Sequence, residues 1–228
     1  MTGPLAVLRP EPGNTATAAL IEALGLPPLR LPLFAVQAID WSPPDPADHD
    51  ALLLTSANAI RFGGPGLAPL QHLPVFAVGP KTAETARAAG FDVLAAGQVD
   101  ASALLALAGA RGISRALHLA GRHRTIEAGG PVSRTIAVYA SEDTPVSATQ
   151  VQNLRGSIAL LHSARAAKRL AALADLYGVP RASIGIAALS PAVAAAAGPG
   201  WATIAAAAVP TDPALIEAAR KAWSQDRA

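Results

Sequence analysis

The sequence predicts an α/β protein made of two small units, each with a largely parallel sheet. The first observation is a series of short apolar runs, each followed by a loop and usually by a helical stretch. Runs of this length without alternation are typical of strands covered on both faces. The second observation is that similar segments recur at a constant spacing. The length of 228 residues allows one large domain or two small ones.

The elements follow one another in the order expected for βα repeats. Strands are predicted over 5–8, 51–54, 75–78, 116–119, 158–161 and 184–188. Helices are predicted over 15–24, over 81–89, over 103–108 and from about 211 to 223. Gly90 is a good C-terminal cap for the second helix, and Thr211 can cap the last helix at its start.

Three pairs of segments match at the same offset of 111 residues, which predicts a duplicated plan. Segment 5–8 resembles 116–119, the segment at Pro80 resembles that at Pro191, and 103–105 resembles 214–216. Ordinary βα repetition without duplication is the alternative, and both interpretations give two small α/β units.

A further pair of segments, 34–37 and 136–139, looks like two matching strands but has an offset of only 102. We therefore expect the repeat that starts at 116 to lack a helix after its first strand, where 125–131 forms a loop.

Composition excludes several classes of protein. Hydrophobic residues make up 51% and charged residues 15%, which excludes a disordered chain. The net charge of +2 comes without a basic tract, so no nucleic-acid partner is expected. The absence of cysteine excludes disulfides, thiolate zinc sites and cysteine nucleophiles. No signal peptide and no apolar run of about 20 residues is present, so we expect a cytoplasmic protein without a membrane partner.

Polar and basic residues gather where predicted strands end and helices begin. In open α/β sheets this edge binds ligands, and helix starts there favour anions. The candidate binding residues are Arg9, Thr55, Ser56, Asn58, Lys81, Thr82, Gly121, Arg122, Ser163, Arg165 and Ser190. Simple helix capping by the hydroxyl and amide side chains explains their positions equally well, and capping and anion binding can coexist.

Motifs for common cofactors are absent from the sequence. It contains neither Gly-x-Gly-x-x-Gly after a first strand nor a Walker loop, which argues against nucleotide binding. The five histidines are scattered without the spacing of a metal site, and no Gly-x-Ser-x-Gly elbow occurs. We therefore expect no nucleotide cofactor and no metal.

The ordered set of segments resembles the uroporphyrinogen-III synthase family over essentially the whole chain. The segments are Leu54-Thr-Ser-Ala-Asn-Ala-Ile60, Ala77-Val-Gly-Pro-Lys-Thr-Ala83, Leu119-Ala-Gly-Arg122, Val138-Tyr139, Leu161-His-Ser-Ala-Arg-Ala166, Ser190-Pro-Ala-Val-Ala194 and Pro210-Thr-Asp-Pro-Ala-Leu215.

The resemblance implies a cofactor-free lyase that cyclises hydroxymethylbilane, a linear tetrapyrrole with eight carboxylates. Loss of water gives an azafulvene, and closure through a spiro-pyrrolenine inverts ring D. The implied partners are this substrate and, for its hand-over, the preceding enzyme of the pathway. A monomer is expected.

The resemblance also implies two α/β domains around a substrate cleft, joined by a two-stranded connection, with one domain discontinuous. The boundaries map to 1–35 with 140–228 for the discontinuous domain and to 36–139 for the inserted one. This agrees with the matching strands 34–37 and 136–139.

Tyr139 is the candidate catalytic residue. It ends the second connecting strand in this interpretation, and a phenol can donate the proton that the leaving hydroxide needs. The resemblance places a tyrosine here as the leading candidate, and an interdomain packing tyrosine is the alternative.

Three departures from the family pattern bear on individual contacts. The segment 121–139 is short, Ser190-Pro-Ala-Val lacks a threonine, and His162 replaces an aromatic or hydroxyl residue. Two other functions stay open: a non-catalytic bilobal small-molecule binding protein, and a family member without activity.

Overall fold

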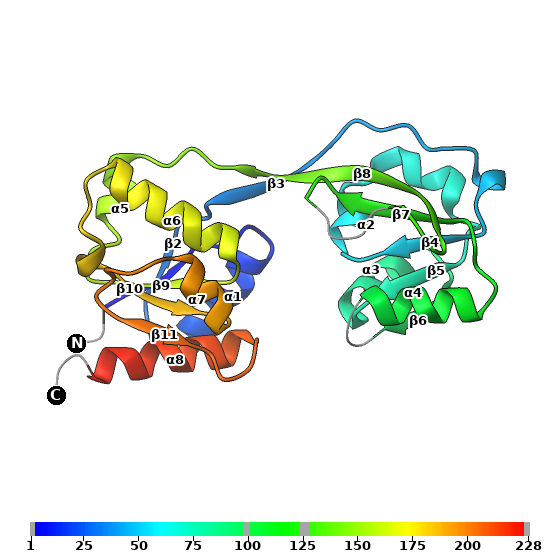
Figure 1. Ribbon diagram of the computed structural model, residues 1–228. Coiled ribbons are helices and arrows are strands. Elements are labelled where there is room, and N and C mark those ends of the chain that lie inside the picture. The colour runs from blue at the N-terminus through cyan, green and yellow to red at the C-terminus, as the bar shows by residue number, and fades with distance from the viewer. Residues whose placement is uncertain (1–2, 98–100, 124–127, 226–228) are drawn as a thin grey trace. The chain divides into compact units, whose positions relative to one another are not determined.

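The computed structural model describes residues 3–97, 101–123 and 128–225. The chain divides into two compact units. The outer unit consists of Met1–Ala35 and Asp143–Ala228, and the inner unit is the continuous stretch Val36–Glu142. The chain passes from one unit to the other within strands β3 and β8 (Figure 1).

The outer unit contains a five-stranded parallel sheet in the order β11-β10-β9-β1-β2. Its strands are β1 (Leu5–Val7), β2 (Pro28–Arg30), β9 (Ile158–Leu161), β10 (Gly185–Ala188) and β11 (Ile204–Ala206). Its helices are α1 (Gly13–Glu22), α5 (Ala148–Gln152), α6 (Ala164–Leu176), α7 (Pro191–Ala196) and α8 (Asp212–Gln225), with a 3₁₀ turn at Arg181–Ser183.

Both faces of the outer sheet are covered by helices. Leu161 and its neighbours on one face pack against α5, α6 and α7, for example against Leu170. Leu160 and its neighbours on the other face pack against α1 and α8, for example against Leu215. Successive strand residues point to opposite faces, so both sets are buried. This explains the unbroken apolar runs in the sequence.

The inner unit contains a six-stranded sheet in the order β3-β8-β7-β4-β5-β6. Its strands are β3 (Phe34–Ala38), β4 (Ala51–Leu54), β5 (Val75–Val78), β6 (Val93–Gly97), β7 (Ala116–Gly121) and β8 (Val132–Asp143). Its helices are α2 (Asn58–Phe62), α3 (Pro80–Ala88) and α4 (Ala101–Ala110), with 3₁₀ turns at Pro46–Asp48 and Gly64–Leu70. α2 and α3 cover one face, and α4 packs on the other.

The two sheets share one plan. The inner order β8-β7-β4-β5-β6 repeats the outer order β2-β1-β9-β10-β11, and all these neighbours are parallel. The three segment pairs matched at an offset of 111 residues occupy equivalent strands or helices in the two orders. The match between 34–37 and 136–139 does not, because these segments lie in β3 and β8, and the counterpart of β8 in the outer sheet is β2. The strand order reverses between β1 and β9 and between β4 and β7, which are the switch points where α/β sheets bind ligands.

The repeat that starts at 116 was expected to lack a helix after its first strand, and the described residues there agree with this prediction. β7 is followed by the parallel strand β8, and the described residues between them, 122–123 and 128–131, are not helical. The rest of the predicted loop, 124–127, lies outside the described residues.

The two strands that link the units lie side by side. Ile39 N donates a hydrogen bond to Val138 O (3.0 Å), and Thr144 N donates to Leu33 O (3.0 Å). Tyr139 does not end its strand, because β8 continues to Asp143. The prediction of a strand end was wrong here. The polar sequence Ser-Glu-Asp after Ala140 is typical of a loop, but pairing with β3 keeps this segment extended.

The predicted fold class is confirmed, and most boundaries differ by one or two residues. Strands 51–54, 75–78 and 158–161 have the predicted bounds. α1 starts at Gly13, two residues before the predicted start. Gly90 follows α3 with a φ of +87°, which suits glycine. Within the described residues, the helices are too short or too polar to cross a bilayer.

Candidate functional site

The strand-end edge of the inner unit is set by the register of its central strands. Leu54 at the end of β4 lies opposite Leu119 of β7 and Ala77 of β5. The segments that follow these strands therefore leave the sheet at one edge. They contain six predicted binding residues, Thr55, Ser56, Asn58, Lys81, Thr82 and Arg122, and a seventh, Gly121, is the last residue of β7.

The polar side chains after β4 are held by local hydrogen bonds. Thr55 is half-buried, with Oγ1 3.2 Å from Nε2 of His118. Ser56 Oγ accepts a hydrogen bond from Asn58 N (3.2 Å), and Asn58 Oδ1 accepts one from Arg61 Nη1 (3.2 Å). Ser56 thus shapes the turn into α2 without being its N-cap, because Ala57 holds that position and makes no side-chain cap.

The start of α3 presents unpaired backbone donors at the same edge. Gly79 precedes the helix with a φ of +79°, and Pro80 is its first residue. The first N–H groups of a helix have no partner within the helix and favour anions. Lys81 in this turn is exposed, so a ligand can reach it from solvent, whereas Thr82 is buried.

Tyr139 lies over the end of β7. It is the register partner of Gly121, and a Cβ atom added to Gly121 would come within 2.8 Å of the tyrosine ring. Glycine therefore makes room for the phenol. The Phe62 ring at the end of α2 lies 6.4 Å away between centroids. Arg122 N donates to Tyr139 O (2.8 Å), and the Arg122 side chain pairs with Glu142 (2.5 Å). Tyr139 is half-buried at the edge where the other candidates gather.

The outer unit has an equivalent edge. Val7 of β1 lies opposite Leu160 of β9, and Leu161 lies opposite Ala188 of β10. The residues after these strands include the predicted Arg9, Ser163, Arg165 and Ser190. His162 also lies here, directly after β9.

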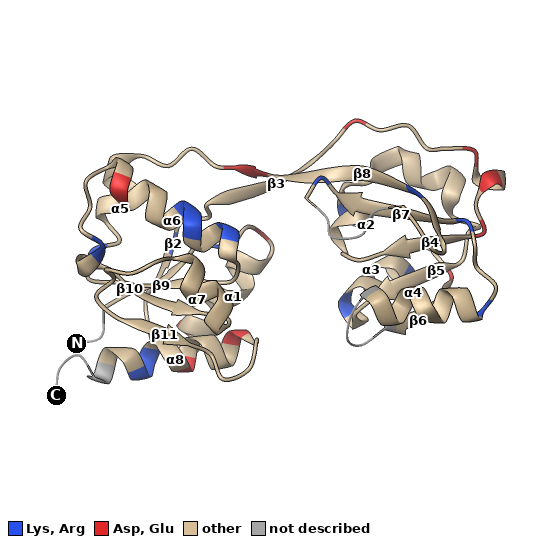
Figure 2. Ribbon diagram, in the orientation of Figure 1, with Lys and Arg blue, Asp and Glu red and all other residues tan. Residues whose placement is uncertain are grey.

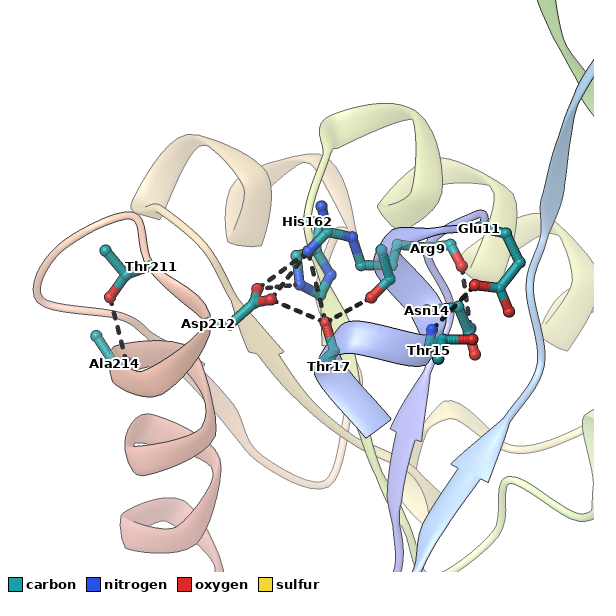
Figure 3. Close-up of polar contacts among 10 residues, drawn as sticks. Arg9, Glu11, Asn14, Thr15, Thr17, His162, Thr211, Asp212 and Ala214 are labelled. Atoms are coloured by element: carbon teal, nitrogen blue, oxygen red, sulfur yellow. Dashed lines mark hydrogen bonds and ion pairs between the residues drawn. The ribbon is translucent and has the colours of Figure 1, made fainter. Parts of the chain in front are cut away.

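Asp212 at the start of α8 is the centre of a polar cluster at this edge (Figure 3). Its carboxylate accepts hydrogen bonds from His162 Nε2 (2.8 Å), Thr17 Oγ1 (2.9 Å) and Arg9 Nη1 (3.0 Å). Hydrogen bonding to His162 is the main cause that lowers the pKa of Asp212, against opposing desolvation, with further lowering from Thr17 and Arg9. The predicted anion-binding guanidinium of Arg9 therefore already faces a carboxylate of the chain itself.

The position of Arg9 is fixed from two sides. A Cβ atom added to Gly13 would lie 2.3 Å from Arg9 Nε, so the guanidinium lies directly against the first turn of α1. Buried Asn14 donates to Val7 O (2.8 Å) and to Arg9 O (3.0 Å), which holds the backbone after β1.

Ser163 and Ser190 are both N-caps. Ser163 Oγ accepts from Ala166 N (3.2 Å), and Ser190 Oγ accepts from Val193 N (3.4 Å). Their hydroxyls therefore serve the capping role that was one of the two predicted interpretations.

Arg165 follows Ser163 in the first turn of α6 and has partners from another part of the outer unit. It pairs with Asp143 (2.7 Å), and its guanidinium lies 4.2 Å from the centroid of the Phe34 ring. Figure 2 shows basic residues, coloured blue, on α6.

Sequence reasoning did not identify Asp212, Thr17 or the acidic partners of Arg122 and Arg165. In the sequence, Asp212 was noted only as the residue after the predicted helix cap Thr211. In the structure, Thr211 Oγ1 accepts a hydrogen bond from Ala214 N (3.4 Å). Its partners lie far from it in sequence, so the sequence offers no local signal of the cluster.

Other features of the described residues do not mark a site. Among them, no three His, Asp or Glu side chains come together as a metal ion would need. An apolar groove of about 290 Å³ lies between α1 and α8, lined in part by Leu20, Leu24 and Ile216, and it contains none of the predicted residues.

The fold defines a class of protein: an α/β protein of two units whose parallel sheets share one doubly wound strand order, with hydroxyl groups, guanidinium groups and helix N-termini at the edges where such sheets bind ligands. The family model of uroporphyrinogen-III synthase HemD matches residues 15–217. The chain belongs to this family, as the resemblance implied.

Solved structures agree with this fold. The uroporphyrinogen-III synthetase of Helicobacter pylori matches with a TM-score of 0.65 and 17% identity, covering 96% of this chain and 99% of the other. A mutant uroporphyrinogen III synthase of the extremely thermophilic bacterium Thermus thermophilus matches with a TM-score of 0.51 and 16% identity, covering 98% and 100%. No protein with a curated description matches the chain.

Proposed function

We propose that this chain is a uroporphyrinogen-III synthase that converts hydroxymethylbilane into the type III macrocycle by closing the ring with inversion of ring D. The family match over residues 15–217 carries this proposal. The reaction proceeds through loss of water from ring A, attack by ring D on the resulting azafulvene, and a spiro-pyrrolenine that reopens and closes again. It takes place in the cytoplasm and without a cofactor.

The carboxylates of the substrate bind at the strand-end edges by hydrogen bonds rather than through a large excess of positive charge. In the inner unit, Lys81 and the first N–H groups of α3 form a site for one carboxylate, with Thr55 and Ser56 on the neighbouring strand end. Such a site explains how a chain with a net charge of +2 holds a polyanion.

Most of the rate enhancement comes from holding rings A and D together. Orientation of this kind contributes up to about 7–11 kcal/mol in favourable cases. The reaction therefore needs no nucleophile from the protein.

Tyr139 assists the first step as a proton donor to the departing hydroxide. Its ring lies against Gly121, at the edge that carries the proposed carboxylate ligands of the inner unit. The electron-rich pyrrole already activates the leaving group, so we expect assistance of at most ~10²–10⁴-fold.

The direct test is to supply hydroxymethylbilane, oxidise the product and separate the porphyrin isomers by chromatography. Closure with inversion of ring D gives the type III isomer, and closure without inversion gives the type I isomer. Formation of type III at a rate proportional to protein concentration supports the proposal. Binding of the substrate without type III formation would identify a non-catalytic binding protein or an inactive family member instead.

The role of Tyr139 is tested by Tyr139→Phe, which removes the hydroxyl and keeps the ring. We expect a large loss of kcat with a modest change in KM. Tyr177→Phe is the matched control, because Tyr177 is the other tyrosine and its hydroxyl donates to Val146 O (2.7 Å) in the outer unit. Unchanged turnover in Tyr139→Phe, at unchanged stability, would make Tyr139 a packing residue.

A further inference from the structure

A histidine lies buried beneath the strand-end edge of the inner unit. His118 is on β7, opposite Leu53 of β4, and its side chain is fully buried. Its Nε2 lies 3.2 Å from Oγ1 of Thr55, the first residue after β4. Side chains alternate along a strand, so Thr55 lies on the same face as Leu53 and is the diagonal neighbour of His118. The histidine therefore contacts a residue proposed to bind substrate.

The surroundings of His118 show that packing alone does not call for a histidine. The sheet face that it shares is apolar and contains Leu53, Ala116 and Val132. A buried polar nitrogen needs hydrogen bonds to replace those that it loses to water, whereas leucine would fill the same face without this requirement. The hydrogen bond to Thr55 meets part of this need at the end of the face that reaches the candidate site.

We propose that His118 is a positioning residue that makes the Thr55 hydroxyl a hydrogen-bond donor toward a substrate carboxylate. When Nε2 carries a hydrogen, it donates to Thr55 Oγ1, and the hydroxyl hydrogen must then point away from His118. Thr55 is half-buried at the strand end, and in this proposal its hydroxyl hydrogen points toward the edge. Both the neutral Nε2–H tautomer and the imidazolium impose the same direction.

This inference deepens the proposed function and rests on it. A hydroxyl that donates to a carboxylate makes a charge-assisted hydrogen bond, which is stronger than one between neutral groups. The bond forms equally with the bound substrate and in the transition state, because the carboxylates take no part in the chemistry. Its loss should therefore raise KM and leave kcat nearly unchanged.

The test is a double-mutant cycle with His118→Leu and Thr55→Val, in which both substitutions keep approximate volume and remove the polar atoms. We expect Thr55→Val to raise KM by roughly 10- to 100-fold, the range for loss of one hydrogen bond to a charged group, and His118→Leu to raise it by no more than that. The double variant should match Thr55→Val alone, because His118 acts only through the hydroxyl. An unchanged KM in His118→Leu, or the same increase in the Thr55→Val background, would overturn the inference.

A second pair of variants decides the matter if His118→Leu fails to fold. Glutamine places an amide nitrogen about where histidine has Nε2, whereas the shorter asparagine ends near the position of Nδ1. We expect His118→Gln to keep a KM close to that of the wild type and His118→Asn to raise it. Equal KM values for the two variants would contradict a role through Thr55.

The type III assay on the wild type separates this inference from the proposed function. A wild type that forms no type III isomer overturns the proposed function. In that case, each variant of the cycle is titrated with the type III porphyrin, and binding is monitored by the quenching of tryptophan fluorescence. The dissociation constant from this titration then takes the place of KM. Coupling between His118 and Thr55 in that constant would support the positioning role, and additive effects would refute it.

Discussion

Replacement of Asp212 by asparagine removes one negative charge from the centre of the outer unit's polar cluster and changes the volume very little. Asp212 joins α8 to α1 through Thr17, to the segment after β1 through Arg9 and to the segment after β9 through His162. All three partners donate to the carboxylate. An amide offers one acceptor oxygen without a negative charge, so it cannot accept from all three partners as the carboxylate does.

The size of the effect follows from burial. The Asp212 side chain is 19% exposed and that of His162 10%, so their hydrogen bond is shielded from water, whereas Arg9 is 32% exposed. Hydrogen bonds to charged groups contribute about 1.5–3 kcal/mol each, and exposed ion pairs about 0–1 kcal/mol. We expect Asp212→Asn to lower the free energy of unfolding of the outer unit by about 2–3 kcal/mol at neutral pH.

The pH dependence has a definite sign. The pKa of Asp212 is lower in the folded protein than its ordinary value, which is about 3.9 in an unfolded chain. The stabilisation by the carboxylate is therefore fully present above about pH 4–5 and is lost as the pH falls through the folded pKa. The difference in stability between wild type and Asp212→Asn should shrink as the pH falls below about 4.

Urea unfolding followed by tryptophan fluorescence measures this difference. The chain has three tryptophans, of which Trp41 is in the inner unit and Trp201 and Trp223 are in the outer unit. A Trp41→Phe background therefore reports on the outer unit alone. With a slope of about 2 kcal/mol per molar urea, the expected loss moves the midpoint by about 1–1.5 M at pH 7.

The matched control is Glu217→Gln on the same helix. Glu217 is an exposed carboxylate with Arg220 at 3.5 Å and Lys221 at 3.6 Å, and such pairs contribute little. We expect its midpoint to stay within about 0.3 M of the wild type. A difference between wild type and Asp212→Asn that stays constant from pH 7 to pH 3 would refute the assignment of the stabilisation to the ionised carboxylate.

Three further substitutions test contacts at the two edges. Gly121→Ala places a methyl group 2.8 Å from the Tyr139 ring, so the ring must move, and kcat should fall with little change in the melting temperature. Gly13→Ala brings a methyl group to 2.3 Å from Arg9 Nε, so the urea midpoint should fall, and by less when Asp212→Asn is already present. Ser163→Ala removes the N-cap of α6 and should cost about 1 kcal/mol in urea unfolding; an unchanged midpoint would contradict the capping role.

The sequence allows prediction of elements whose residues are buried on both faces of a sheet. β4, β5 and β9 were predicted with their observed bounds because each is a short apolar run bounded by polar residues or, for β5, by Pro74 and Gly79. The edge strand β11 was not predicted. It is three residues long, and two of them are exposed, so its sequence carries no burial pattern.

The candidate site could be predicted as a set of positions but not as a set of contacts. Helix starts after strands identify the edge residues, because the local chain fixes them. The pairing of Arg9 with Asp212 joins residues from opposite ends of the chain, and only the assembled outer sheet brings them together. The contact of His118 with Thr55 depends on the register of β7 against β4, which the apolar runs alone do not specify.

The insertion of one unit within the other has a consequence for the order of folding. Leu5 on β1 pairs with Ile158 on β9, so about 150 residues separate two adjacent strands of the outer sheet. Folding of the inner unit takes about 107 of these residues, Val36–Glu142, out of the flexible loop. By the logarithmic dependence of closure entropy on loop length, this shortening makes contact between β1 and β9 easier by about 1 kcal/mol, or roughly sixfold. During synthesis the inner unit is also complete before β9 emerges, so the continuous sheet forms first and brings together the two segments that build the discontinuous one.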